Sequence, residues 1–261
     1  MYRGVVLDLD GTVYRGGSPI AGAPEAIDRL RERGLSVLFF SNNPTKSREA
    51  YVSRLAEMGI ETDASGVLSA GTVTTEYLAR HHAEEPTFLV GSEGLHEQLV
   101  AADLPVTDDT YAAEVLVASW DDEFHYDDMT DAYRAGADGA TFLGSDPDVV
   151  VPASGDRMVP GSGAIVNAVA GVLERDPDRV LGKPSAEAVE MSREALGVPL
   201  EDCLVVGDRL NTDLALGERA GMTTVLVRTG VATDADVRAS DVTPDYVLDS
   251  LAEIDTVLDD A

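Results

Sequence analysis

The stretch Val5-Val6-Leu7-Asp8-Leu9-Asp10-Gly11-Thr12 decides the fold, because an apolar run leads directly into two carboxylates. Its three apolar residues, two of them β-branched, predict a short buried strand. Residues two apart on an extended chain point to the same side, so Asp8 and Asp10 should face one shared space, and Gly11 permits a sharp turn after them. A buried strand does not keep bare charges, so the pattern favours cation binding or nucleophilic attack. An Asp-Gly turn that closes a hairpin is the structural alternative.

The composition is strongly acidic. The chain has 261 residues, of which 44% are apolar, so a packed core of one large or two modest domains is expected. Acidic residues outnumber basic ones 48 to 19, which gives a formal net charge of −29. Such a surface repels nucleic acid and anionic lipid, so we expect neither as a partner. The acids are spread along the chain, as in a surface suited to high salt, where counterions screen the repulsion.

Cysteine usage and the N-terminus indicate a soluble cytoplasmic protein. Cys203 is the only cysteine, so no internal disulfide can form, and its apolar surroundings predict a buried, inert thiol. The first residues lack the long apolar core of a signal peptide, since Asp8 interrupts it early. No stretch approaches the roughly 18 apolar residues that a membrane helix needs.

The first part of the chain alternates helices and strands. A helix is predicted from Pro24 to Gly34, a buried strand over 35–40, and a second helix over 46–58. This alternation predicts an α/β fold with a doubly wound parallel sheet, in which ligands bind at the carboxyl ends of the strands. Asp8, Asp10 and the cluster Ser41-Asn42-Asn43 all follow such strand ends.

The middle of the chain continues the α/β pattern without paired acids comparable to those at the start. Strands are predicted over 87–90, 115–119 and 140–143, and helices end near 82, follow 94 and span 164–173. We predict a smaller inserted α/β cap domain over 73–176, with a catalytic core over 1–72 and 177–261. The loop 144–148 and the turns at Gly155 and 161–163 are candidates for substrate contact, or ordinary surface turns.

The last part returns to strands that run into polar residues. Lys183 precedes a proline that opens a helix over 185–196, and the strand 204–207 leads to Asp208 and Asp213. Thr212 or a neighbour can cap the next helix. Further strands are predicted over 223–227 and 246–248, and a final helix over 251–258.

Together, the strand ends suit a metal and a phosphate. Carboxylates such as Asp8 and Asp208 form a hard oxygen site of the kind that binds Mg²⁺. Lys183 and the Ser41 and Asn42 donors indicate that an anion binds beside the metal, and phosphate is the usual one. The set therefore provides the placement and charge neutralisation that phosphoryl transfer needs.

These motifs resemble those of the haloacid dehalogenase superfamily of phosphatases. The resemblance lies in Asp8-Leu9-Asp10-Gly11-Thr12, Ser41-Asn42, Lys183 in Gly-Lys-Pro, and Gly207-Asp208 with Asp213. The finer pattern Asp-Gly-Thr-Val-Tyr-Arg-Gly, Ser-Asn-Asn and Gly-Lys-Pro is similar to the NagD-like, p-nitrophenylphosphatase-like subfamily, which carries a large α/β cap. The resemblance spans nearly the whole chain and implies a Rossmann-like core.

The resemblance also implies a role for each motif residue. Asp8 is the nucleophile that forms an aspartyl-phosphate, and Asp10 is the general acid and then the base. Lys183 neutralises both nucleophile and phosphate, which Ser41, Asn42 and the Gly11 turn help to hold. The Mg²⁺ ligands that the resemblance implies are Asp8, the backbone carbonyl of Asp10, Asp208, and Asp213 acting through water or through Lys183.

The cap departs from the family pattern at one place. Related caps tend to read Thr-Asn-Pro-Asp where this chain has Ser145-Asp146-Pro147-Asp148. An acid in place of the amide would disfavour strongly anionic substrates unless it faces away. Phosphoglycolate, glycerol phosphate, a sugar phosphate, a nucleotide and p-nitrophenyl phosphate all remain possible substrates, and the resemblance implies a dimer through the caps.

Two other functions stay open. One is a regulatory protein that binds Mg²⁺ and phosphate without turnover. The other is a phosphotransferase or mutase that passes the phosphoryl group from the same aspartate to a second substrate.

Overall fold

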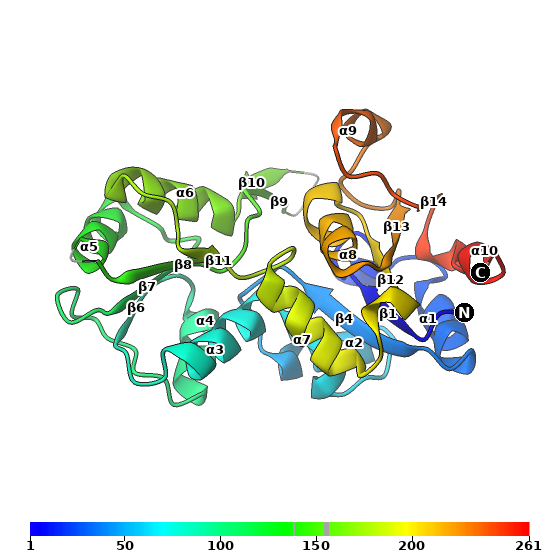
Figure 1. Ribbon diagram of the computed structural model, residues 1–261, viewed down its shortest axis with the longest axis horizontal. Helices are drawn as coiled ribbons and strands as arrows, with labels where there is room; N and C mark the ends of the chain where they lie inside the picture. The colour runs from blue at the N-terminus through cyan, green and yellow to red at the C-terminus, as the bar shows by residue number, and fades with distance from the viewer. Residues whose placement is uncertain (138, 154–156, 261) are drawn as a thin grey trace. The chain divides into compact units, whose positions relative to one another are not determined.

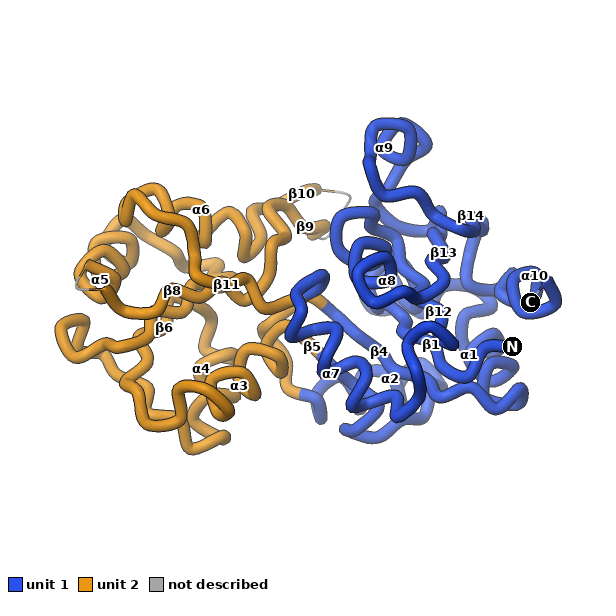
Figure 2. The backbone as a smooth tube through the Cα atoms, in the orientation of Figure 1, with its two compact units in different colours: residues 1–41, 48–68, 183–261 blue, residues 42–47, 69–182 orange. Residues whose placement is uncertain are grey.

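The computed structural model describes residues 1–137, 139–153 and 157–260, and the chain divides into two compact units (Figure 2). Unit 1 contains residues 1–41, 48–68 and the chain from 183 onward, and unit 2 contains residues 42–47 and 69–182. The segment 73–176, predicted to be the inserted cap, falls within unit 2; its action as a cap stays a prediction. Gly155 lies outside the described residues.

Unit 1 is built on a six-stranded sheet in the order β14-β13-β12-β1-β4-β5 (Figure 1). The pairings from β14 through β4 are all parallel, as the alternation of strands and helices predicts. Because β1 has parallel neighbours on both sides, the hairpin alternative for Asp10-Gly11 is wrong. The strands of the sheet are β1 (Gly4–Leu7), β4 (Ser36–Ser41), β5 (Val67–Ser69), β12 (Cys203–Gly207), β13 (Thr223–Val227) and β14 (Tyr246–Leu248).

Side chains alternate across this sheet, so both of its faces are covered. Val5 and Leu7 of β1 belong to a core that includes residues of α1, α2 and α10, whereas Val205 of β12 packs against Gly217 of α8 on the other face. A two-stranded hairpin of β2 (Tyr14–Arg15) and β3 (Ser18–Pro19) follows the first motif. The helices are α1 (Ala23–Glu32), α2 (Arg48–Glu57), α7 (Ala186–Leu196), α8 (Ala215–Ala220), α9 (Asp234–Ala239) and α10 (Asp255–Leu258), with 3₁₀ turns at Ala64–Gly66, Leu200–Asp202 and Leu251–Glu253.

Two expectations for the last third are wrong. The predicted helix over 251–258 is a 3₁₀ turn at Leu251–Glu253 followed by the short α10, Asp255–Leu258. A side-chain cap at or near Thr212 does not form on α8, whose first turn follows a π-helical turn at Leu210–Leu214. The backbone of that turn supplies carbonyl oxygens instead: the Ala215 N–H at the start of α8 donates to the carbonyl oxygens of Leu210 and Thr212, so this N–H needs no side-chain cap.

Unit 2 has its own parallel sheet in the order β11-β8-β7-β6. Helices α5 and α6 pack on one face around Leu116, Phe142 and Val169, and α3 and α4 lie on the other (Figure 1). The elements are α3 (Ala70–His81), β6 (Thr87–Val90), α4 (Glu93–Ala101), β7 (Val115–Ala118), α5 (Tyr126–Gly136), β8 (Thr141–Gly144), the antiparallel pair β9 (Val150–Pro152) and β10 (Met158–Pro160), α6 (Ser162–Leu173) and β11 (Arg179–Val180).

The single cysteine lies inside β12, as its apolar surroundings predict. The Cys203 thiol is buried and donates to the carbonyl oxygen of Pro199 at 3.3 Å. Burial raises its pKa to about 11, so the thiol is not ionised at neutral pH. Among the residues that the structure describes, no helix has the length and apolar character to cross a bilayer.

Candidate active site

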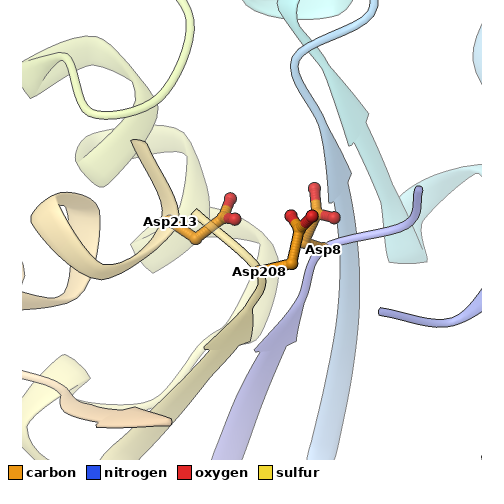
Figure 3. Close-up of side chains that lie close together, drawn as sticks. All are labelled: Asp8, Asp208 and Asp213. Atoms are coloured by element: carbon orange, nitrogen blue, oxygen red, sulfur yellow. The ribbon is translucent and has the colours of Figure 1, made fainter. Parts of the chain in front are cut away.

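Three carboxylates meet at the carboxyl end of the unit 1 sheet (Figure 3). Asp8 directly follows β1, Asp208 directly follows the neighbouring parallel strand β12, and Asp213 comes from the π-helical turn. One carboxylate oxygen from each lies within 4.8 Å of the others, and all three residues are buried. The rule that parallel strands place their ends at one edge accounts for the pairing of Asp8 with Asp208.

A buried lysine, Lys183, contacts two of these three carboxylates although it is far from Asp8 in the sequence. The Lys183 ammonium donates to Asp8 Oδ1 at 2.8 Å, to Asp213 Oδ1 at 2.7 Å and to the carbonyl oxygen of Phe40 at 2.6 Å. Only 1% of the Lys183 side chain is exposed. All three N–H donors of the ammonium therefore have acceptors, which is the condition for burying a charge.

The pKa of Lys183 follows from these contacts. Burial alone would lower it, but the negative charges of Asp213 and Asp8 and their hydrogen bonds raise it above its ordinary value. The lysine is therefore a permanent cation, suited to holding negative charge and unsuited to donating a proton.

Close backbone approach shapes the position of Asp208. Its Oδ2 accepts from the Val231 N–H at 2.7 Å, which fixes the carboxylate. Gly11 has φ +95°, and a Cβ there would lie 2.5 Å from Asp208 Oδ2; a Cβ at Gly230 would meet the same carboxylate. Only glycine fits at Gly11 for both reasons, conformation and space.

The buried acidic side chains at this site outnumber the buried basic ones. Burial raises the pKa of Asp208 to about 7, and the neighbouring Asp213 adds to the shift. Burial also raises the pKa of Asp8, with contributions from Asp213 and Asp208, although Lys183 opposes the shift. When all three buried carboxylates are ionised, the one buried ammonium leaves two negative charges in excess. A divalent cation with a preference for oxygen ligands fits this group of residues.

Two other residues predicted for the site, Asp10 and Ser41, have environments that differ from that of the three buried carboxylates. Asp10 is exposed, and among the described residues its carboxylate does not join the acidic group; the backbone-carbonyl role implied for it does not require that. Ser41 is the last residue of β4, is 5% exposed and shares a hydrogen bond with the Tyr51 hydroxyl of α2. The sequence predicts only that Tyr51 lies in the helix over 46–58, and the helical pattern carries no signal for that bond.

Asn42 and the loop 145–148 form a buried polar group within unit 2. Asn42 Nδ2 donates to Asp148 Oδ2 at 3.3 Å, and the two side chains are buried. Asp146, the acid at the place where related caps have an amide, is 2% exposed and accepts from the Ser145 hydroxyl at 3.0 Å. Burial raises the pKa of Asp146 to about 7, and the charge of Asp148 adds to the shift. Sequence reasoning missed the role of Asp148 as a partner of Asn42.

Comparisons with known proteins agree along the whole chain. A family model described as "Haloacid dehalogenase-like hydrolase" matches residues 5–105, and an HAD-hydrolase-like model matches residues 180–254. The sugar-phosphatase AraL of Bacillus subtilis is 34% identical over 96% of this chain and 91% of its own length. The acid sugar phosphatase of Staphylococcus aureus is 32% identical over 97% of this chain and 96% of its own length.

Solved structures give the same result. The p-nitrophenyl phosphatase from Archaeoglobus fulgidus superposes with a TM-score of 0.92 at 35% identity, covering 98% of this chain and 99% of that one. NagD from Escherichia coli gives a TM-score of 0.85 at 26% identity, covering 97% of this chain and 98% of that one. From its motifs, its sheet topology and these relatives, the chain belongs to the haloacid dehalogenase-like hydrolase family, with NagD and the p-nitrophenyl phosphatases among its relatives.

Proposed function

We propose that the chain is a Mg²⁺-dependent phosphatase that hydrolyses small phosphomonoesters through an aspartyl-phosphate on Asp8. The observation that carries this proposal is the buried Lys183, which contacts Asp8 and Asp213 beside the acidic group. A cation fixed against a carboxylate offsets the repulsion that a phosphate dianion would otherwise meet as the carboxylate attacks it. The relatives named sugar phosphatase and p-nitrophenyl phosphatase support the same reaction.

In the proposed reaction, a carboxylate oxygen of Asp8 forms a bond to phosphorus as the bond from phosphorus to the ester oxygen breaks. The leaving alkoxide takes its proton from Asp10, which then removes a proton from water as the water attacks the aspartyl-phosphate. Free phosphate leaves, and Asp8 and Asp10 return to their starting states. Asp10 is exposed to solvent, as the residue that activates the attacking water must be.

The remaining residues hold charge in place. Mg²⁺ would be held by the carboxylates of Asp8 and Asp208 and by the backbone carbonyl oxygen of Asp10. Asp213 would contribute either as a direct ligand or indirectly, through its contact with Lys183. When bound, Mg²⁺ would supply the positive charge that neutralises the transferring phosphoryl oxygens. Lys183, Ser41, Asn42 and the backbone turn at Gly11 bind the phosphate in this proposal.

We further propose that the substrate is a sugar phosphate, because two of the relatives are named sugar phosphatases. Unit 2 would act as the cap that selects the leaving group, and the protein would work in the cytoplasm, as a homodimer through the caps.

The deciding test replaces Asp8 with Asn, which keeps the shape and removes the nucleophile. Hydrolysis of p-nitrophenyl phosphate should fall to background, whereas the control Asp28→Asn, an exposed carboxylate on α1, should keep normal turnover. Normal hydrolysis by Asp8→Asn would refute the mechanism. Loss of turnover on addition of EDTA separates an enzyme from a non-catalytic phosphate-binding protein. Phosphoryl transfer to an added alcohol with little free phosphate would favour the phosphotransferase alternative.

A further inference from the structure

The contact between Asn42 and Asp148 joins two residues far apart in the chain. Asn42 follows the last residue of β4, and Asp148 follows β8 of unit 2; the two are 106 positions apart. Asn42 Nδ2 lies 3.3 Å from Asp148 Oδ2, and the residues are 9% and 6% exposed. A hydrogen bond to a buried carboxylate is stronger than one between neutral groups, so this contact restrains Asn42.

Asp148 is itself held rigidly. Its backbone N–H donates to Asp146 Oδ1 at 3.1 Å, and its carbonyl oxygen accepts from the Gly163 N–H at 2.9 Å, at the start of α6. Side chains at Gly161 and Gly163 would meet the carbonyl oxygens of Asp148 and Pro147, so the loop and the helix start fit only without them. Asp148 therefore offers a fixed acceptor instead of a mobile one.

The segment that carries Asn42 is restrained on its other side as well. Gln98 of α4 donates through Nε2 to the carbonyl oxygen of Pro44 at 2.9 Å. Gly71 of α3 and Gly94 of α4 lie so close to the carbonyl oxygens of Pro44 and Thr45 that a side chain at either position would collide with them. The backbone of residues 42–47 is thus fixed within unit 2.

The two ends of the Asn42 amide meet different surroundings. A carboxylate only accepts hydrogen bonds, so Asp148 selects the amide orientation that presents nitrogen to it. On the oxygen side, a Cβ added at Gly182 would lie 2.9 Å from Asn42 Oδ1. Asp148 therefore favours one orientation of the amide over the flipped one, and the missing side chain at Gly182 leaves room for the amide beside it.

We propose that Asp148 is a positioning residue that sets the orientation of Asn42, and with it the donors that residue 42 offers to the phosphate. This inference rests on the proposed function, because it concerns the site at which phosphate binds. In this proposal Asp148 acts through Asn42, so it is a positioning residue and not a catalytic one. The ligand whose binding should depend on Asp148 is a phosphate dianion, either as part of the substrate or as free inorganic phosphate.

A double-mutant cycle with Asn42→Ala and Asp148→Ala tests the coupling. In the single variant Asp148→Ala, kcat/KM for p-nitrophenyl phosphate should fall by about 10- to 100-fold, the effect of losing one hydrogen bond to a charged group. The loss should appear mainly as a higher KM and as weaker competitive inhibition by inorganic phosphate, with an unchanged Mg²⁺ dependence. In the Asn42→Ala background, Asp148→Ala should have no further effect.

Two further variants separate positioning from general structural damage. Asp148→Asn keeps an acceptor oxygen and should restore kcat/KM to within about threefold of wild type, because it can still accept from Asn42. Asp178→Ala removes a unit 2 carboxylate that accepts from the Phe142 N–H at 2.7 Å and has no contact with Asn42 among the described residues, so its KM should not change. If Asp148→Ala does not fold, Asp148→Ser takes its place in the same cycle.

Additive effects of the two substitutions, or an equal rise in KM in the Asp178 control, would overturn the inference. These results are distinct from a failure of the proposed function. That failure would appear as normal turnover in Asp8→Asn, whereas an inactive Asp8→Asn with additive effects at residues 42 and 148 would refute only the positioning role.

Discussion

Replacing Lys183 with Met should destabilise the protein strongly, because Met keeps the apolar stem and removes the ammonium. The ammonium contacts Asp8 and Asp213 at 2.8 and 2.7 Å, and also the Phe40 carbonyl oxygen and, at 5.2 Å from its centroid, the Phe40 ring. Removing one partner of a buried ion pair costs about 3–5 kcal/mol, because the other charge stays buried and unpaired. Each kcal/mol shifts the melting temperature of a chain of this size by about 2–4 °C, so a fall of about 6–20 °C is expected.

The measurement is thermal unfolding followed by circular dichroism in EDTA at pH 7.5. The deficit should shrink toward pH 4.5, since protonation of the carboxylates removes the uncompensated charge. Arg219, an exposed cation in the last turn of α8, provides the control, and Arg219→Met should melt close to wild type. A Lys183→Met variant that melts within about 2 °C of wild type at pH 7.5 would show that the ion pairs contribute little, and would refute the reasoning.

Two more predictions concern the acidic group. The pKa of Asp208 is raised from 3.8 to about 7, so the metal-free folded state binds more protons than the unfolded state, and the free energy of unfolding should fall as pH rises from about 4 to about 7. Melting curves at pH 5 to 8 should show this decline in EDTA and lose it in excess MgCl₂; the same slope in both would contradict the assignment. Gly11→Ala should weaken the apparent affinity for Mg²⁺ in activity titrations by about tenfold or more, because its Cβ would lie 2.5 Å from Asp208 Oδ2. Gly16→Ala, also at positive φ but with open space around it, isolates the backbone effect, and equal losses in the two variants would refute the steric argument.

The parallel sheet and the acidic group could be predicted from the sequence because both obey local rules. Apolar runs of four or five residues that end in polar ones mark buried parallel strands, and such strands deliver Asp8 and Asp208 to one edge. The strands Thr87–Val90, Thr223–Val227 and Tyr246–Leu248 have the predicted bounds. The roles of Asp8, Asp10, Ser41, Asn42 and Lys183 in the reaction stay predictions.

What the sequence could not predict depends on contacts between distant residues. The hydrogen bond from Asn42 to Asp148 depends on how two loops meet in unit 2, which no periodicity encodes. At the π-helical turn Leu210–Leu214, Asp213 accepts from Lys183, 30 positions away, a contact that local sequence patterns do not encode. Whether Asp146 faces solvent was equally undecidable, since a carboxylate is buried only where hydroxyl and N–H donors surround it.

The inert thiol of Cys203 makes the chain well suited to site-specific labelling. Because that sulfur is buried and protonated at neutral pH, maleimide dyes should leave it untouched, and a cysteine introduced on the surface would react alone. One dye on an exposed position of α1 and another on α5 would make a fluorescence energy-transfer pair with one dye in each unit. Such a pair would report whether the distance between the two units changes when vanadate or phosphate binds, without the native cysteine having to be removed.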